Sequence, residues 1–385
     1  MKTVTILGAT GSVGTSTLDL IERAPDQFKV LGLTANRDAK GLAAAAIRTN
    51  ARYAVVADEA ALPELRAALA GTGIVSAGGT QAVCDTAALG ADWTMAAIVG
   101  CAGLRPVMAA LERGGTVVLA NKEPLVSAGP LVLEAAARHG ATLLPADSEH
   151  NAIFQCFDSV RSNRVRRVIL TASGGPFRDT SVAEMRGMTP EQAVAHPNWS
   201  MGAKISVDSA TMMNKGLELI EAARLFPVRP DQLEIIVHRQ SVIHSMVEYV
   251  DGSILAQLGP SDMRTPIAHT LAWPDRMETA MAPLDFATLG RLDFEAPDPE
   301  RFPALRLARE ALEADGARPA ILNAANEVAV AAFLARAIGF LEIAAIVADT
   351  LACYSPAAPD SLDAVLAIDA EARAIAGERV KDCVA

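Results

Sequence analysis

The sequence lacks the features that mark secreted, membrane and disulfide-stabilised proteins. Its 385 residues include five scattered cysteines, an odd number without metal or redox spacing: Cys84, Cys101, Cys156, Cys353 and Cys383. We therefore expect free thiols in a reducing cytoplasm. No apolar run reaches ~18 residues, which argues against a membrane-spanning helix. The chain opens on a strand-like run with no basic region or cleavage site, so we expect no signal peptide.

Positive charge is also scarce. Lys and Arg total 34 against 45 Asp and Glu, a net charge of −11. This balance disfavours a broad nucleic-acid surface, which needs a basic stripe, but permits one cationic pocket for a small phosphorylated ligand. With 51% hydrophobic and 21% charged residues the chain is globular, and its length predicts two or three domains.

The first segment alternates short apolar runs with Ala-rich helical stretches. The runs lie at 4–7, 28–33, 53–57, 74–76, 94–99, 116–120 and 141–144. This rhythm predicts an α/β fold with a Rossmann-like, doubly wound parallel sheet. Ligands of such sheets bind at the carboxyl ends of the strands.

A glycine-rich turn, Gly8-Ala-Thr-Gly-Ser-Val-Gly14, follows the first run and precedes an amphipathic helix. Glycines allow a tight turn and close backbone approach, and the helix N-terminus offers N–H groups to a pyrophosphate. A plain Gly-rich turn is the alternative. After the next strand, Asn36 and Arg37 favour a 2′-phosphate and hence NADP over NAD, whereas Asp38 weighs against it. Arg37 as ordinary surface is the other possibility.

Two further strand ends carry polar residues. Asn121, Lys122 and Glu123 follow the run at 116–120, where Lys122 can polarise a carbonyl. A lysine extending from a loop is the alternative. Asp147 and Glu149 follow the run at 141–144, and on a continuing strand they would project to one side as ligands for a hard cation. This stretch marks the seam between two domains.

The second segment contains two candidate ligand loops. A strand at 166–171 leads into Ala172–Phe177, where Ser173 beside two glycines can hold an anion or form a plain turn. The loop His196–Gly202 contains Trp199 between Pro and Gly, which suits a mobile lid over a ligand at about 194–203. A surface loop with Trp199 tucked into the core is the alternative.

A helix is expected over 206–221, capped by Ser206 or Asp208. Near its start Ser209, Asn214 and Lys215 can converge on one anion, while Glu218 offers a third carboxylate. Taken by themselves, Lys215 and Glu218 are better explained as a surface contact at i,i+3, because such pairs are common. Strands at 234–238, 241–250 and 253–258, the last two joined by Asp251-Gly252, complete a small antiparallel or mixed sheet.

The remainder is Pro-rich from 275 to 303 and then helical. Four helices are expected at about 304–314, 319–337, 340–354 and 360–377, forming a bundle without assigned chemistry. The predicted organisation is a cofactor-binding Rossmann-like domain at 1–147, an α+β catalytic and dimerisation domain at 148–274, a linker at 275–303 and a helical bundle at 304–385.

Together these stretches resemble 1-deoxy-D-xylulose 5-phosphate reductoisomerases. The resemblance rests on the motifs Gly8–Gly14, Ala120–Glu123, Asp147–Gln155, Ser173–Phe177, His196–Gly202, Lys204–Glu218, Gln240–Ser245 and Asn323–Val328. It implies an NADPH-dependent, Mg²⁺- or Mn²⁺-dependent cytoplasmic homodimer of the non-mevalonate isoprenoid pathway. Such an enzyme rearranges 1-deoxy-D-xylulose 5-phosphate and reduces the product to 2-C-methyl-D-erythritol 4-phosphate.

The resemblance also implies roles for single residues. It makes Asp147, Glu149 and Glu218 the metal ligands, and Lys122, Glu149 and His196 the catalytic residues. Substrate contacts would come from Lys122, Ser148, Glu149, Ser173, His196, Trp199, Ser209, Asn214, Lys215 and Glu218. The cofactor would meet Thr10, Gly11, Ser12, Val13, Asn36, Arg37, Asn121, Glu123 and Gly202.

Three residues depart from the family pattern. Asp38 stands where relatives often have Asn, Arg239 replaces a usual Pro, and Pro124 replaces a usual Ser. One alternative function is a simple NADP-dependent dehydrogenase of a phosphorylated hydroxy acid, which would not need three carboxylates beside a phosphate pocket. Another is a catalytically idle nucleotide-binding protein, which would be marked by loss of Lys122, Glu149 or Glu218.

Overall fold

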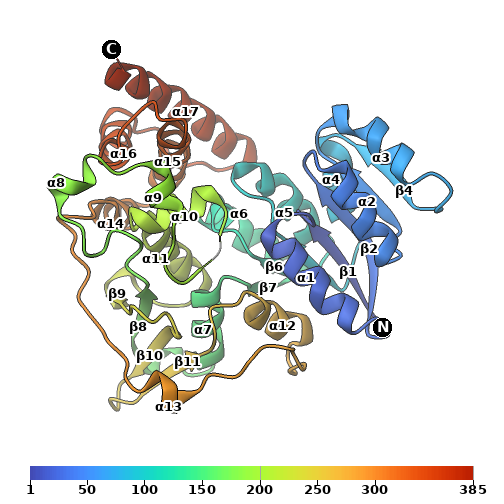
Figure 1. Ribbon diagram of the computed structural model, residues 1–385, viewed down its shortest axis with the longest axis horizontal. Coiled ribbons are helices and arrows are strands. Elements are labelled where there is room, and N and C mark those ends of the chain that lie inside the picture. The colour runs from blue at the N-terminus through green and yellow to red at the C-terminus, as the bar shows by residue number, and fades with distance from the viewer. Residues whose placement is uncertain (200, 385) are drawn as a thin grey trace. The chain divides into compact units, whose positions relative to one another are not determined.

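The computed structural model describes residues 1–199 and 201–384 (Figure 1). Two compact units emerge. Unit 1 comprises Met1–Pro124, Pro130–Asn151 and Met263–Met281, and unit 2 comprises Leu125–Gly129, Ala152–Asp262 and Ala282 onward. Within the described residues, no helix has the length and hydrophobicity needed to span a membrane. All five cysteines are free thiols, as predicted.

Unit 1 is built on a seven-stranded parallel sheet of order β4-β3-β2-β1-β5-β6-β7. Its strands are β1 (Lys2–Leu7), β2 (Phe28–Ala35), β3 (Tyr53–Val56), β4 (Val75–Gly78), β5 (Trp93–Ala96), β6 (Thr116–Leu119) and β7 (Thr142–Pro145). The strand order reverses between β1 and β5, the switch point at which doubly wound sheets bind ligands. The predicted Rossmann-like fold is confirmed.

The helices of unit 1 alternate with these strands. They are α1 (Ser12–Arg23), α2 (Ala39–Arg48), η1 (Glu59–Ala61), α3 (Leu62–Ala68), α4 (Thr80–Ala87), η2 (Cys101–Gly103), α5 (Leu104–Leu111) and α6 (Glu123–His139, of which Leu125–Gly129 belongs to unit 2). Alanines and leucines such as Leu42, Ala43 and Ala46 form the buried stripe of α2, which explains the Ala-rich composition.

A late segment of the chain returns to unit 1. Helix α12 (Arg264–Ala272) packs on α1 and β7, with Ile267 and Leu271 fully buried. Its carbonyls accept hydrogen bonds from Lys2 Nζ (2.7 Å, to Leu271) and Trp93 Nε1 (3.0 Å, to Thr270). The domain predicted at 148–274 included these residues, and no helix was predicted for them; a local pattern does not show which core receives a segment.

Unit 2 contains a four-stranded mixed sheet of order β11-β10-β8-β9. Its strands are β8 (Val165–Ala172), β9 (Leu233–Val237), β10 (Ile243–Tyr249) and β11 (Ile254–Leu258). β8 and β9 are parallel, whereas β10 is antiparallel to β8 and β11. The predicted hairpin is present, with its turn at Asp251-Gly252.

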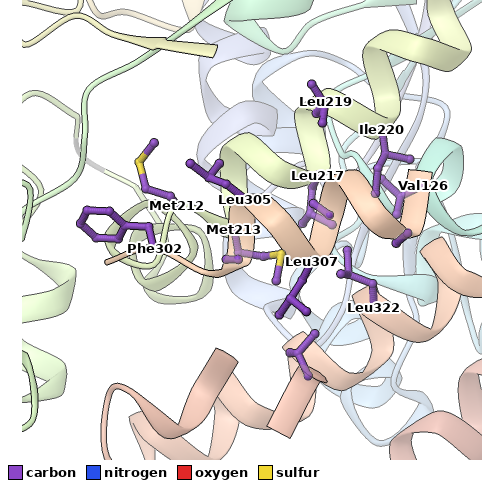
Figure 2. Packing of buried hydrophobic residues seen from close by; sticks show 14 of the residues in the cluster. Val126, Met212, Met213, Leu217, Leu219, Ile220, Phe302, Leu305, Leu307 and Leu322 are labelled. Atoms are coloured by element: carbon purple, nitrogen blue, oxygen red, sulfur yellow. The ribbon is translucent and has the colours of Figure 1, made fainter. Parts of the chain in front are cut away.

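The helices of unit 2 gather around one large core (Figure 2). They are α7 (Ser148–Cys156, whose first turn lies in unit 1), η3 (Ser162–Arg164), α8 (Val182–Met185), α9 (Pro190–Val194), α10 (Ala203–Ala210), α11 (Met213–Leu225), η4 (Pro230–Gln232), α13 (Phe286–Leu289), α14 (Ala304–Ala314), α15 (Arg318–Leu334), α16 (Glu342–Cys353) and α17 (Leu362–Val384). Leu217 and Ile220 of α11 pack with Leu307 of α14 and Leu322 of α15, so the C-terminal helices share the core of the sheet.

Two local predictions were wrong. The helix expected over 206–221 is broken, because Met212 adopts a left-handed backbone (φ 62°) between α10 and α11. Asp208 therefore lies inside α10 and does not cap the long helix. The chain at Asp147–Glu149 is not a continued strand either: β7 ends at Pro145 and α7 begins at Ser148.

Candidate active site

The glycine-rich turn of unit 1 joins β1 to α1. Gly8 has φ +87°, and a Cβ there would lie 2.5 Å from the Ala97 carbonyl oxygen. A Cβ on Gly14 would lie 2.3 Å from the Gly8 carbonyl oxygen. Larger residues are thereby excluded, and the first turn of α1 carries no acidic side chain. The N-terminus of α1, which begins at Ser12, thus offers the positive end of a helix to an anion, whereas the Gly11 N–H is used within the turn and donates to the Gly8 carbonyl oxygen (3.1 Å).

Beyond β2, the candidate cofactor residues Asn36 and Arg37 and their neighbour Asp38 are exposed at the surface. Arg37 Nε lies 2.7 Å from Asp58 Oδ2, and its side chain is 78% exposed. Asp38 caps α2 by accepting a hydrogen bond from Gly41 N (2.8 Å). The Asp38 carboxylate therefore stabilises the N-terminus of α2.

A hollow lies in unit 1 at the carboxyl ends of β1, β5 and β6; its empty volume of about 190 Å³ includes open solvent, and it encloses no space the size of a water molecule. Its walls are apolar apart from one amide and come from Leu7, Ala96, Ile98, Gly103, Val107, Asn121 and Pro124. The buried Asn121 Nδ2 has no hydrogen-bond partner among the described residues. A buried donor without a partner indicates a site for an acceptor group of a ligand.

Lys122 and Asp147 form an ion pair in unit 1, with side chains 8% and 9% exposed. They follow the adjacent strands β6 and β7, so the parallel sheet brings them together across 25 residues. His150 Nδ1 lies 3.1 Å from Asp147 Oδ1. Burial alone would raise the pKa of Asp147, but Lys122 and His150 outweigh burial and hold it well below its usual range. Asp147 is therefore an ionised carboxylate.

Glu149 belongs to the first turn of α7 and is half-buried. Ser148 Oγ donates a hydrogen bond to Glu149 Oε2, and Asp147 Oδ1 accepts one from Glu149 N (3.2 Å). The two carboxylates are thus neighbours through a strand-to-helix turn, whereas the sequence predicted an extended strand. His150 stands within the same motif, but no role for it was predicted from the sequence.

Ser173 and His196 meet in unit 2. Ser173 Oγ lies 2.9 Å from His196 Nε2 and also accepts a hydrogen bond from Gly175 N (3.1 Å). His196 Nδ1 accepts hydrogen bonds from the backbone N–H groups of Asn198 (3.1 Å) and Trp199 (3.0 Å). In the neutral ring the proton is then on Nε2, which donates to Ser173. The Ser173 hydroxyl hydrogen remains available for an anion.

The predicted lid loop lies between α9 and α10; its Ser200 is outside the described residues. Trp199 is half-buried, and its ring lies 6.0 Å from that of His244 in an edge-to-face contact. Asn198 Nδ2 donates to the Arg239 carbonyl oxygen (2.9 Å). His244 itself is buried and received no role from the sequence, although it belongs to the motif Gln240–Ser245.

Lys215 and Glu218 form a second buried ion pair, on α11. Their side chains are 4% and 1% exposed, and Asn214 Nδ2 also donates to Glu218. The alternative of an ordinary surface contact is therefore wrong. Ser209 lies at the end of α10, where Gly175 packs against its backbone: a Cβ on Gly175 would lie 2.5 Å from the Ser209 carbonyl oxygen. Unit 2 thus brings the Ser173 loop and Ser209 together.

Sequence comparisons agree along the whole chain. Residues 4–129 match the family model described as 1-deoxy-D-xylulose 5-phosphate reductoisomerase, and residues 143–226 and 258–375 match two models of its C-terminal domains. A reductoisomerase of this name from Zymomonas mobilis is 65% identical over 97% of this chain and 96% of its own. Another from Rhodospirillum centenum is 58% identical over 99% and 94%. The chain belongs to the 1-deoxy-D-xylulose 5-phosphate reductoisomerase family.

Solved structures of the reductoisomerase family match the fold. The Zymomonas mobilis enzyme in complex with NADPH superposes with a TM-score of 0.94 at 62% identity, covering 99% of both chains. A reductoisomerase in complex with NADPH, fosmidomycin and magnesium also gives 0.94, at 42% identity and 99% and 98% coverage.

The three residues that depart from the reductoisomerase pattern all have structural partners. Asp38 caps α2, as described above. Arg239 pairs with Asp179 on the loop after Ser173 and with Glu295. Pro124 lies in the first turn of α6, where proline is favoured, and lines the hollow beside Asn121.

Proposed function

We propose that this chain catalyses the NADPH- and divalent-metal-dependent rearrangement and reduction of 1-deoxy-D-xylulose 5-phosphate to 2-C-methyl-D-erythritol 4-phosphate, a step of the non-mevalonate isoprenoid pathway. The identity of 65% over almost the full length of a named reductoisomerase carries this proposal. The buried ion pairs Lys122–Asp147 and Lys215–Glu218 support it, because they bring together carboxylates that can bind a metal ion and lysines that can bind anionic groups of a substrate.

We assign Asp147, Glu149 and Glu218 as ligands of Mg²⁺ or Mn²⁺. The ionised state of Asp147 and the all-oxygen character of the three side chains fit a hard cation. Bound there, the cation supplies Lewis-acid polarisation of the substrate's adjacent oxygens. Lys122 and Lys215, which pair with two of these carboxylates, offset their negative charge when no cation is bound.

We assign Lys122 and Ser148 to contacts with the substrate near its reacting carbons. Lys122 carries a buried positive charge that can stabilise developing negative charge on a substrate oxygen. Ser148 orients Glu149 through its hydrogen bond.

The phosphate of the substrate is assigned to Ser173, Ser209, Asn214 and Lys215. Ser173 has two hydrogen bonds to its oxygen and so directs its own hydrogen outward, as an anion site needs. Phosphate contacts distant from the reacting carbons provide binding energy for alignment and for closure of the lid over the substrate. His196 and Trp199 are assigned to that lid, and His196 also orients Ser173.

NADPH is assigned to unit 1, where it supplies the hydride. Its pyrophosphate would lie on Thr10 to Val13 and its 2′-phosphate near Asn36 and Arg37. The nicotinamide would lie beside Asn121, whose Nδ2 has no hydrogen-bond partner among the described residues and fits a carboxamide oxygen. The remaining residues assigned to the cofactor are Glu123 of unit 1 and Gly202 of unit 2.

The enzyme is proposed to be a cytoplasmic homodimer. The free thiols fit a reducing compartment. In the unit 2 sheet, Ile254 and Leu255 of the edge strand β11 are about half exposed (49% and 50%), as an edge covered by a second copy would be.

The decisive experiment incubates the purified protein with 1-deoxy-D-xylulose 5-phosphate, Mn²⁺ and NADPH, and follows the absorbance of the reduced nicotinamide. Carbon NMR of a ¹³C-labelled product then tests for the branched skeleton. Oxidation of NADPH with a branched product is expected. Oxidation with an unbranched product would instead favour the simple dehydrogenase, and no oxidation in the presence of metal would exclude both.

A further inference from the structure

Helix α10 is held by one buried carboxylate, that of Asp208. Its side chain is 2% exposed and accepts a hydrogen bond of 2.8 Å from Asn326 Nδ2 on α15, 118 residues further along the chain. Lys204 Nζ, one turn earlier on α10, lies 2.8 Å from the other carboxylate oxygen. Asp208 thus connects the start of α10 with the C-terminal helices.

The hydrogen bond to Asp208 fixes the orientation of the Asn326 side-chain amide. Asn326 is fully buried, and its Oδ1 has no hydrogen-bond partner among the described residues. Turning the amide over would place Oδ1 against the Asp208 carboxylate, so only one orientation is favourable. A buried charge that loses a hydrogen-bond donor is strongly destabilised, which resists rotation or sliding of α10 along α15.

Helix α10 lies between two parts of the proposed site. It begins directly after the lid loop, with Gly202 as its first flanking residue, and Ser209 follows Asp208. The close approach of Gly175 to the Ser209 carbonyl joins the end of α10 to the Ser173 loop. The position of α10 therefore sets the spacing between Ser209 and Ser173.

We propose that Asp208 and Asn326 are positioning residues for the phosphate end of the substrate. Neither is placed in contact with the substrate; they hold α10 so that Ser209 and Ser173 bind one phosphate together. The C-terminal helical region thereby acquires a role in substrate affinity. This inference rests on the proposed function, which supplies the phosphorylated substrate.

The test compares the full-length wild type with Asn326→Ala and Asp208→Asn. For Asn326→Ala we expect KM for the sugar phosphate to rise about tenfold. This factor corresponds to the free energy of one hydrogen bond to a charged group. The kcat should fall by less than the KM rises, because only part of the phosphate binding energy is used for alignment, and the KM for NADPH should stay within about twofold. Inorganic phosphate, titrated calorimetrically as a probe without turnover, should bind Asn326→Ala about tenfold more weakly.

Asn323→Ala is the matched control. Asn323 is also fully buried, one turn earlier on α15, but donates to Glu327 and not to α10. It should lower thermal stability without changing KM or phosphate affinity. An equal rise of KM in Asn323→Ala, or unchanged KM and phosphate affinity in Asn326→Ala, would overturn the proposal.

If Asn326→Ala does not fold, the variant Asp208→Asn provides the test. The new amide keeps an oxygen for Asn326 but loses the charge opposite Lys204, so a smaller increase in KM is expected in a folded protein. A wild-type KM in that variant would contradict the inference. If the wild type binds phosphate but does not convert the sugar phosphate, only the proposed function fails, and the calorimetric comparison still decides the inference.

Discussion

The two units each contain one buried lysine–carboxylate pair, and the pairs arise in different ways. Lys122 and Asp147 of unit 1 are 25 residues apart and meet because β6 and β7 are neighbours in the sheet. Lys215 and Glu218 of unit 2 are three residues apart on one helix. The first pair depends on the topology of a domain, whereas the second needs only a helix with that face buried. We therefore expect mutations in the two ion pairs to change the stability of the protein by different amounts.

Asp147→Asn should have the largest effect. It removes a proposed metal ligand and leaves the Lys122 charge buried without its carboxylate. Because changing a residue that merely supports a metal ligand costs about 10–100-fold, we expect kcat to fall by more than about 100-fold. Unit 1 should also lose roughly 3–5 kcal/mol of stability, measured by urea unfolding. NADPH affinity should persist; normal turnover would refute the ligand assignment. The exposed Asp85→Asn serves as a neutral control.

Glu218→Gln tests the helix-built pair. The loss of kcat should match that of Asp147→Asn, but the loss of stability should be smaller, because a glutamine oxygen still accepts from Asn214. Glu378→Gln is the matched control, since Glu378 forms an i,i+3 pair with Lys381 in which the side chains are 70% and 73% exposed. That variant should change stability by less than about 0.5 kcal/mol. Equal destabilisation by Glu218→Gln and Asp147→Asn would remove the distinction between the pairs.

Replacing each lysine by methionine separates their roles. Lys122→Met should lower kcat by about 100-fold, as expected for a group that stabilises developing charge. Lys215→Met should instead raise KM for the sugar phosphate by about tenfold, through loss of a charged phosphate contact. Steady-state kinetics with saturating NADPH distinguish the two patterns, and an exchanged pattern would reverse the assignment.

Arg37→Ala should affect only the cofactor. The KM for NADPH should rise about tenfold while that for NADH is unchanged, because a guanidinium contact to the 2′-phosphate is lost. Equal effects on the two cofactors would show that Arg37 only pairs with Asp58.

A pH effect of modest size is expected from His269, which lies 3.1 Å from Asn151 Nδ2 in unit 1. Burial and then Arg276 lower its pKa from 6.5 to about 4. The unfolded chain therefore takes up the proton first as the pH falls, so stability decreases between about pH 6.5 and 4 and levels off below. Urea midpoints of wild type and His269→Gln across this range should diverge; parallel curves would exclude the contribution.

Sequence patterns predicted the local structure around the candidate residues where local rules apply. The glycine-rich turn, the strand ends at Lys122 and Asp147, and the Lys215–Glu218 spacing all follow from short-range geometry. The predicted helix over 206–221 was wrong, because a left-handed residue such as Met212 has no sequence signal comparable to glycine. His150 and His244 were missed because a lone histidine in a motif has no spacing partner from which a role can be inferred.

The sequence by itself determined the succession of strands and helices along unit 1 and the glycine-rich turn, since these depend on periodicity and backbone sterics within a few residues. It also showed which charged residues follow the strands. Only the tertiary structure decided that Lys122 pairs with Asp147, that α12 returns to unit 1 and that Asn326 holds Asp208. These contacts join residues 25 to 118 positions apart, or assign a helix to one of two cores. Their cause is the burial of apolar surface over a whole unit, which no local pattern contains.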